Sequence, residues 1–112
     1  MQTDVTLSGM RFHVRVGILP HEQEHPQPLD VTLTARLATG AVLLDYRALH
    51  ALTAEVLGAS PLHYLEEIAS TLVTRTCELP GVSSARVAIR KPHVMLDGPL
   101  DFAEIVVDSR VA

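Results

Sequence analysis

The segment Leu62–Leu79, LHYLEEIASTLVTRTCEL, decides how the chain folds, because it is the longest stretch with helical periodicity. Its apolar residues recur at intervals of three and four, which lines one face of an α-helix. Ser60 suits the N-cap and Pro61 the first helical position, while Pro80-Gly81 stops the helix. The pattern predicts a helix over Leu62–Leu79 with a buried face of Leu62, Leu65, Ile68, Ala69, Leu72, Val73 and Cys77.

One carboxylate of this helix lies close to the apolar face. At about 100° per residue, Glu67 falls opposite the apolar residues, whereas Glu66 falls at the edge of their face. A carboxylate held at that edge loses hydration and requires hydrogen-bond donors. The spacing alone leaves two interpretations open: Glu66 turns toward solvent or a basic partner, or it anchors a ligand.

The composition favours one compact domain over residues 1–112. The 112 residues are 47% hydrophobic, enough for a core of its own. The formal net charge of -4, without a run of Lys or Arg, argues against nucleic acid or a membrane as a partner. The N-terminal residues lack the pattern of a signal peptide and no apolar run reaches membrane-spanning length, so we expect a cytoplasmic protein. The single cysteine, Cys77, is expected in the core and excludes an internal disulfide.

Two strands are predicted in the first third of the chain. Residues 10–18 alternate between apolar and polar, and residues 29–37 do the same. The apolar residues before Gly9 have the opposite phase, which indicates one extra residue and predicts a β-bulge near Ser8-Gly9. We expect the two strands to pair antiparallel across a polar loop over residues 20–28.

The remaining elements complete a β-β-α-α-β-β order. Asp45 is a candidate N-cap for a first long helix, with Gly58 in the C′ position. Two further strands are predicted over residues 85–91 and 102–107. This order predicts an α+β fold in which two helices cover one face of a four-stranded antiparallel sheet. The buried face of the first long helix is predicted to comprise Tyr46, Leu49, Leu52, Thr53 and Val56.

The other face of the predicted sheet is polar. Such a face suits a wet interior or an interface, and the two edge strands require blunting or pairing. Edge-to-edge self-association into a closed ring would satisfy both requirements. The residues on this face are Arg11, His13, Arg15, Thr32, Thr34, Arg36, Arg86 and Arg90.

Ionisable residues are concentrated in the loop over residues 17–27. Loops carried by a rigid sheet often hold functional residues, although a solvated hairpin loop explains this one equally simply. His21 and His25 share no element that would fix their spacing and have no convincing third ligand, so we expect no metal site.

Two further residues can transfer protons. Lys91 ends the third strand directly before a proline, where it guards the sheet edge or acts as a proton donor and acceptor in a cleft. Tyr46 follows the capping Asp45, and it is either a core residue with its hydroxyl at the rim or a proton relay.

Taken together, these features resemble bacterial dihydroneopterin aldolase, a family of the tunnelling-fold superfamily. The resemblance spans nearly the whole chain and rests on five motifs in order, none of which is specific alone. They are Leu7-Ser8-Gly9-Met10-Arg11-Phe12, the spacing of Gly17, Glu22 and Gln27, the pair Asp45-Tyr46, the pair Leu65-Glu66, and Ile89-Arg90-Lys91-Pro92.

The resemblance implies a pterin-binding site. Glu66 would accept hydrogen bonds from the 2-amino group and a ring N–H of the pterin, and Leu65 and Leu44 would contact the substrate. A site built in this way rejects rings that lack those donors, because its carboxylate would then be left without them.

The resemblance also implies a reaction. Lys91 would be the general acid and base, assisted by Glu22, and Tyr46 would relay the proton of a substrate hydroxyl. The family cleaves 7,8-dihydroneopterin by a retro-aldol reaction into 6-hydroxymethyl-7,8-dihydropterin and glycolaldehyde, a step of folate biosynthesis. It uses no metal or other cofactor, because the C=N bond of the dihydropterin accepts the electrons. Its members form tetramers or octamers with active sites between subunits.

Two alternatives to an aldolase stay open, an epimerase and a non-catalytic binder, and a third is disfavoured. An epimerase of dihydroneopterin or its triphosphate shares the fold but typically lacks the lysine found at Lys91. A zinc-dependent pyruvoyl-tetrahydropterin synthase would need three ligating histidines with a spacing that His13, His21 and His25 do not show. A non-catalytic pterin-binding oligomer would keep only the scaffold.

Overall fold

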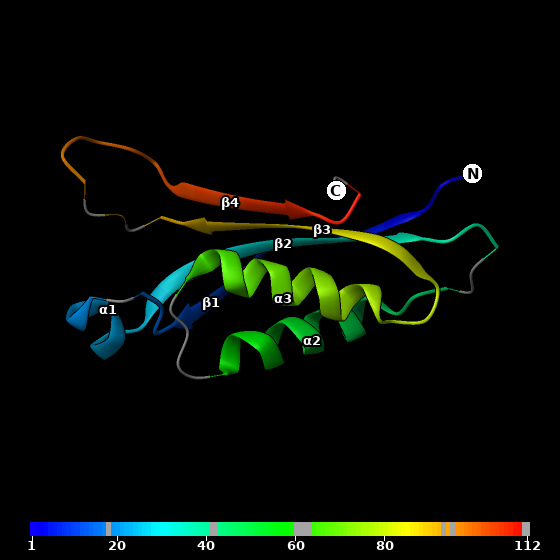
Figure 1. Ribbon diagram of the computed structural model, residues 1–112, viewed down its shortest axis with the longest axis horizontal. Helices are drawn as coiled ribbons and strands as arrows, with labels where there is room; N and C mark the ends of the chain where they lie inside the picture. The colour runs from blue at the N-terminus through cyan, green and yellow to red at the C-terminus, as the bar shows by residue number, and fades with distance from the viewer. Residues whose placement is uncertain (18, 41–42, 60–63, 93, 95, 111–112) are drawn as a thin grey trace.

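Four strands form one antiparallel sheet in the order β1-β2-β3-β4, and two long helices cover one of its faces (Figure 1). The computed structural model describes residues 1–17, 19–40, 43–59, 64–92, 94 and 96–110, with His21 described by its backbone. The predicted α+β class and β-β-α-α-β-β order are confirmed, with one short helix added. The elements are β1 Asp4–Val14, α1 Pro20–Glu24, β2 Gln27–Leu37, α2 Tyr46–Gly58, α3 Leu65–Cys77, β3 Val82–Lys91 and β4 Ala103–Asp108.

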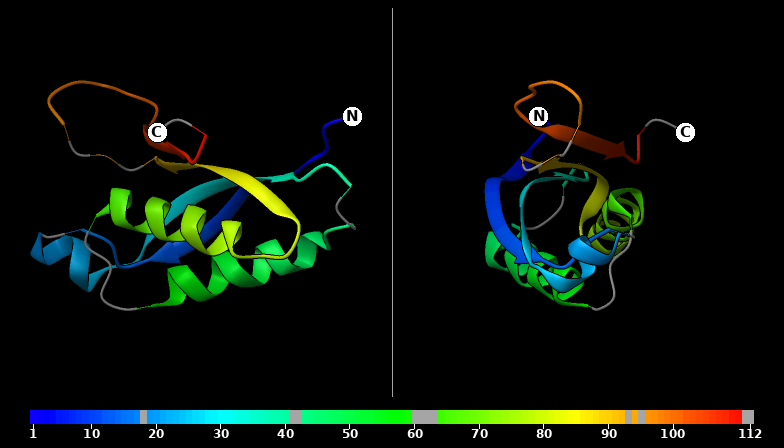
Figure 2. Two further views of the ribbon diagram at one scale, coloured as in Figure 1. Left: turned by 45° about the vertical axis from the view of Figure 1, so that its right-hand side comes forward. Right: turned by 90° about the vertical axis from the view of Figure 1, so that its left-hand side faces the viewer.

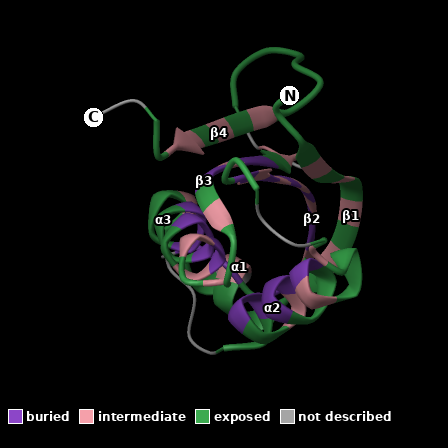
Figure 3. Ribbon diagram, turned by 90° about the vertical axis from the view of Figure 1, so that its right-hand side faces the viewer, coloured by how far each residue is buried: buried purple, intermediate pink, exposed green. Residues whose placement is uncertain are grey.

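The two long helices lie side by side on the same face of the sheet in both orientations of Figure 2. Helix α2 packs over β1, and α3 packs over β3 and β4. The core lies between these layers, and Figure 3 shows buried residues along β2 and on the inner sides of α2 and α3. Its fully buried side chains include Leu29, Val31, Leu33, Leu49, Leu72, Val87 and Ile89.

Two buried threonines are satisfied inside their own helices. The hydroxyl of Thr53 donates to the carbonyl of Leu49, and that of Thr76 donates to the carbonyl of Leu72, both at 2.7 Å. Burying these hydroxyls therefore leaves no orphaned polar group in the core.

The predicted β-bulge in β1 is confirmed. Leu7 pairs with Leu33 and Met10 with Val31, so β1 has one residue more than β2 across this interval. Gly9 takes a φ of 64°, and its N–H donates to the Thr32 hydroxyl at 3.0 Å. The extra residue shifts the alternation of side chains by one position, so the apolar residues before and after the bulge both face the helices.

Helix α3 is shorter than the predicted Leu62–Leu79. It begins at Leu65 because Tyr64 has extended backbone, with φ of -125° and ψ of 138°, and it ends at Cys77. The predicted capping residues Ser60 and Pro61, and Leu62 of the predicted buried face, lie outside the described residues. The predicted buried face is confirmed at Ile68, Ala69, Leu72 and Val73, while Leu65 and Cys77 are only partly buried and pack against the core.

Three other local predictions are wrong. The segment predicted as a loop contains helix α1, whose Glu22 and Gln23 N–H groups both donate to the Leu19 carbonyl. Gly58 is the last residue of α2 and not a left-handed C′ residue, because the cap Ala59 is extended and its N–H bonds to the Val56 carbonyl. Tyr46 is 61% exposed, because the first residue of α2 lies beyond the packed part of the helix.

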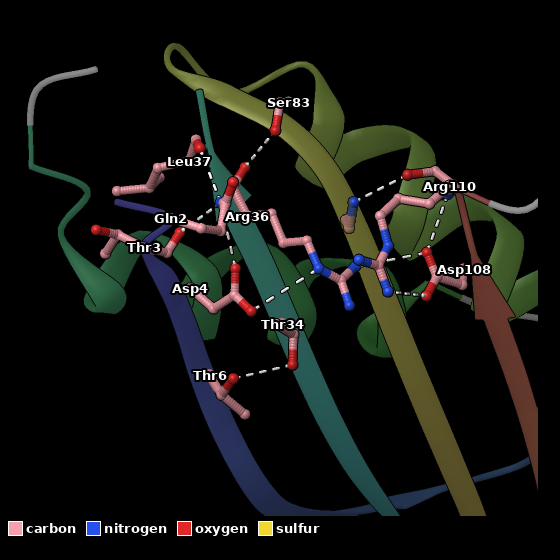
Figure 4. Close-up of polar contacts among 12 residues, drawn as sticks. Gln2, Thr3, Asp4, Thr6, Thr34, Arg36, Leu37, Ser83, Asp108 and Arg110 are labelled. Carbon is pink, nitrogen blue, oxygen red and sulfur yellow. Dashed lines mark hydrogen bonds and ion pairs between the residues drawn. The ribbon is translucent and has the colours of Figure 1, made fainter. Parts of the chain in front are cut away.

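The open face of the sheet carries an arginine between two carboxylates (Figure 4). The Arg36 guanidinium on β2 lies 3.5 Å from the Asp108 carboxylate of β4 and 3.8 Å from the Asp4 carboxylate of β1. Its Nη1 is buried, with no hydrogen bond of good geometry. Arg36 therefore links the two outer strands electrostatically across the sheet.

Candidate active site

A lysine and a glutamate meet at the end of β3. The Nζ of Lys91 donates to Oε2 of Glu22 at 2.6 Å, and the two side chains are only 16% and 13% exposed. Lys91 has the same parity as the buried Val87 and Ile89, so it extends the helix-covered face of β3 beyond the core. It is also the only lysine in the sequence.

Helix α1 supplies the glutamate. Its single turn folds back from β1 and places Glu22 over the end of β3, 69 residues away in sequence from its partner. The backbone N–H of Leu19 donates to the other carboxylate oxygen of Glu22 at 3.3 Å. A charge-assisted pair this short and this sheltered has a fixed geometry, and it can hold or transfer a proton.

Glu66 is exposed, as in the interpretation that turns it toward solvent. It is the second residue of α3, where the flank of the first helical turn faces solvent in the single chain. Helix α3 begins at the same end of the sheet as α1 and the tip of β3 (Figures 1 and 2). A carboxylate acceptor is thus available on the surface at the end of the molecule that carries the Lys91–Glu22 pair.

Tyr46 is not brought to that pair. Helix α2 begins at the opposite end of the sheet from α1, as both views show (Figures 1 and 2). Leu44 lies just before it, half-buried and packed against the core. Within one chain the predicted site residues therefore fall into two groups, with Glu22, Leu65, Glu66 and Lys91 at one end and Leu44 and Tyr46 at the other.

A pocket of about 360 Å³ lies beside Tyr46, between the bulged part of β1 and the first turns of α2. Sequence reasoning named Tyr46 but missed its neighbour His50, which the i, i+4 spacing on one helical face could have revealed. The Asp45 carboxylate caps the helix here by accepting from the Arg47 N–H at 2.9 Å, and the Arg47 guanidinium holds the pKa of Asp45 below its usual range. The pocket is lined by Thr6, Leu7, Ser8, Met10, Tyr46, Arg47 and His50.

The histidines of the chain do not form a metal cluster within the described residues, where no three His, Cys, Asp or Glu residues gather. His13 lines a separate pocket of about 270 Å³ near the C-terminal end of α2. The side chain of His21 lies outside the described part of the chain.

Comparison with known families assigns the chain to one of them. Residues 5–108 match the profile of the family described as FolB, dihydroneopterin aldolase. The chain belongs to the dihydroneopterin aldolase family. Apart from Asp4 of β1, the match covers every helix and strand of the described residues.

Solved dihydroneopterin aldolases share the fold of this chain at low sequence identity. The enzyme from Burkholderia thailendensis, bound to guanine, has a TM-score of 0.82 and 14% identity, covering 96% of this chain and 89% of its own. The E. coli enzyme, in complex with neopterin, has a TM-score of 0.80 and 12% identity, covering 95% of this chain and 97% of its own. An archaeosine synthase QueF-Like protein in the apo form is more distant, with a TM-score of 0.60, 14% identity, and coverage of 96% and 92%.

No curated protein sequence matches the chain at a significant level. Among the described residues, no helix is both long enough and apolar enough to cross a membrane.

Proposed function

We propose that this chain is a 7,8-dihydroneopterin aldolase that uses Lys91 as its general acid and base. The observation that carries the proposal is the 2.6 Å contact between Lys91 and Glu22 in a chain of this family. The only lysine of the chain is held by a carboxylate at the edge of the core, where a proton donor and acceptor has a fixed direction.

Glu66 is the proposed anchor of the pterin ring, with Leu65 beside it. Its exposed carboxylate is an acceptor for two neighbouring donors, and a dihydropterin offers such a pair in its 2-amino group and ring N–H. Guanine and neopterin, held by the Burkholderia and E. coli relatives, carry the same pair of donors. This shared edge supports a pterin as the substrate class.

Tyr46 is the proposed relay for the substrate hydroxyl, and it would come from a neighbouring subunit. One chain presents Tyr46 and the Lys91–Glu22 pair at opposite ends of its sheet, so a complete site requires two copies (Figure 1). A ring in which the β1 edge of one copy pairs with the β4 edge of the next would bring the two groups together. The subunit that supplies Tyr46 would also contribute Leu44 and the pocket beside Tyr46.

The proposed reaction balances without an added co-reactant. Tyr46 relays the proton of the 2′-hydroxyl to water as the C1′–C2′ bond breaks and glycolaldehyde leaves. The electron pair of that bond forms a C6=C1′ double bond, and the π pair of the C=N bond moves to N5, which takes a proton from the Lys91 ammonium held by Glu22 and so gives an enamine. C1′ then takes a proton from water while N5 returns its proton to Lys91, which restores the C=N bond and gives the 6-hydroxymethyl product.

Incubation of the purified protein with 7,8-dihydroneopterin tests the proposal. We expect glycolaldehyde and 6-hydroxymethyl-7,8-dihydropterin in equal amounts. Formation of monapterin alone would identify an epimerase, and the absence of any product would leave a pterin-binding protein, so either result would overturn the aldolase assignment.

Lys91→Ala tests the proposed mechanism. We expect loss of turnover with neopterin binding retained, because the ring is anchored elsewhere at Glu66. The matched control is Arg90→Ala, which removes the adjacent exposed cation that pairs with Glu104 at 2.6 Å. Full activity in the Lys91→Ala protein would contradict the role of Lys91.

A further inference from the structure

Gly17 is a buried glycine between the end of β1 and helix α1. Its φ of 122° lies in the region that side-chain-bearing residues rarely adopt. This backbone conformation reverses the chain so that α1 returns over the end of β3.

The space beside the Gly17 Cα is filled by the Glu22 carboxyl group. A Cβ added at Gly17 would overlap the carboxyl carbon and Oε1 of Glu22, and it would lie 2.7 Å from Oε2. Oε2 is the atom that accepts from Lys91, and Oε1 accepts from the Leu19 N–H. Every side-chain-bearing residue at position 17 would therefore displace the carboxylate from both of these partners.

The contact is reinforced from the same helix. The side-chain amide of Gln23 donates to the Gly17 carbonyl at 3.4 Å, which joins α1 to the turn that it leaves. Glycine is thus required at this position for two separate reasons: its positive φ and the close approach of the glutamate.

We propose that Gly17 is a positioning residue that seats the Glu22 carboxylate for its contact with Lys91. The assignment of a catalytic consequence rests on the proposed aldolase function, but the seating of the carboxylate does not. Gly17 acts through Glu22 and does not itself transfer a proton.

Because Lys91 is the only lysine, its chemical reactivity directly reports whether the Glu22 carboxylate is held against it. An amine-selective reagent such as trinitrobenzenesulfonate can modify only Lys91 and the N-terminal amine, and peptide mass spectrometry separates the two. We expect Gly17→Ala and Glu22→Ala each to raise the modification rate of Lys91 several-fold. The double variant should react no faster than Glu22→Ala alone, because the added methyl group acts only through the carboxylate.

Gly98→Ala is the matched control. Gly98 also has a strongly positive φ, 139°, but a Cβ there would meet no atom within 4 Å. Its substitution imposes comparable backbone strain without a collision, so Lys91 should react at the wild-type rate. An unchanged rate in Gly17→Ala, or an equal increase in Gly98→Ala, would overturn the proposal.

The folding of the variants also decides the question. If Gly17→Ala does not fold while Gly17→Ala/Glu22→Ala does, the collision with Glu22 is the cause and the proposal is supported. If neither folds while Glu22→Ala alone does, the cause is not the carboxylate and the proposal fails.

Turnover adds a second and separate readout. If the protein cleaves dihydroneopterin, Gly17→Ala should lower kcat at least tenfold, about 1.4 kcal/mol, with KM little changed. If the modification rates of Lys91 do not differ among the variants as expected, the positioning role of Gly17 is refuted. An absence of cleavage by the wild-type protein would refute only the proposed function.

Discussion

Glu22 and Lys91 show how far single residues can be assigned from a sequence. Lys91 is a candidate from its place at a strand end, and Glu22 from the family resemblance, which implies that Glu22 assists Lys91. Their separation of 69 residues gives by itself no sign that the two side chains touch. Their contact depends on the path of the backbone through Gly17 and α1, which no periodicity predicts. The pair is therefore predictable as two candidates, and only the folded chain makes them one unit.

Glu66 shows the limit of helical spacing at the residue scale. The spacing correctly placed it on the flank of the buried face, yet the flank at the first turn is exposed in the single chain. A helical wheel gives direction around the axis and not whether another layer covers that direction.

Glu66→Ala should abolish neopterin binding while leaving the fold nearly as stable as before. The side chain is exposed, and its main stabilising effect is the attraction of its charge to the positive end of the helix dipole. The free energy of unfolding should therefore fall by less than about 1 kcal/mol. The matched control is Glu67→Ala, which removes the adjacent exposed acidic residue of the same helical turn. Calorimetric titration with neopterin should show lost binding only for Glu66→Ala, and equal binding by both variants would contradict the anchor.

At the scale of elements, the apolar periodicity identified each strand and both long helices, because these patterns are set by neighbours along the chain. It even located the β-bulge, since one extra residue inverts the phase of the alternation. It missed α1, whose single turn has no apolar face of its own and is held by Leu19 and by the pair with Lys91.

The cap of α2 provides a prediction at this scale. Asp45→Ala removes the acceptor for the Arg47 N–H at the start of the helix and should lower the Tm by roughly 5 °C. Asp45→Asn keeps an oxygen at the same position and should retain most of the stability. Thermal unfolding followed by circular dichroism measures both, and an equal loss in the two variants would show that the charge and not the cap is responsible.

At the scale of the whole molecule, the Asp108 carboxylate, which faces Arg36 on the open side of the sheet, predicts an acid sensitivity. The N–H of Arg110, followed by the charges of Arg36 and Arg110, holds the pKa of Asp108 below its ordinary value, against the effect of its desolvation. A depressed pKa in the folded state stabilises the fold above about pH 4, and this contribution is lost as the pH falls through the folded-state value.

Asp108→Asn should therefore destabilise the protein at pH 7 and have little effect near pH 3. Urea unfolding of the wild type and the variant at both pH values measures this difference. Asp97→Asn, in an exposed loop, is the control and should change little at either pH. A loss of stability that is the same at pH 7 and pH 3 would show that the charge of Asp108 is not involved.

The separation of Tyr46 from Lys91 predicts that active sites form between copies of the chain. Lys91→Ala and Tyr46→Ala proteins should each be inactive, yet mixing them under subunit exchange should restore activity at about a quarter of the interfaces. The mass by light scattering at micromolar concentration should be that of four or eight chains. A monomeric mass, or no recovery on mixing, would contradict the shared site.

The sequence by itself determined the four strands, the two long helices, their order and most of the residues that each one buries, because alternation and helical spacing are local properties. It also determined the residue types that can carry proton chemistry. Only the tertiary structure decided that Glu22 reaches Lys91, that Glu66 is exposed, and that Tyr46 lies at the far end of the sheet. Those outcomes depend on where layers and turns place segments distant in sequence, and a single glycine with φ of 122° directs one of those turns.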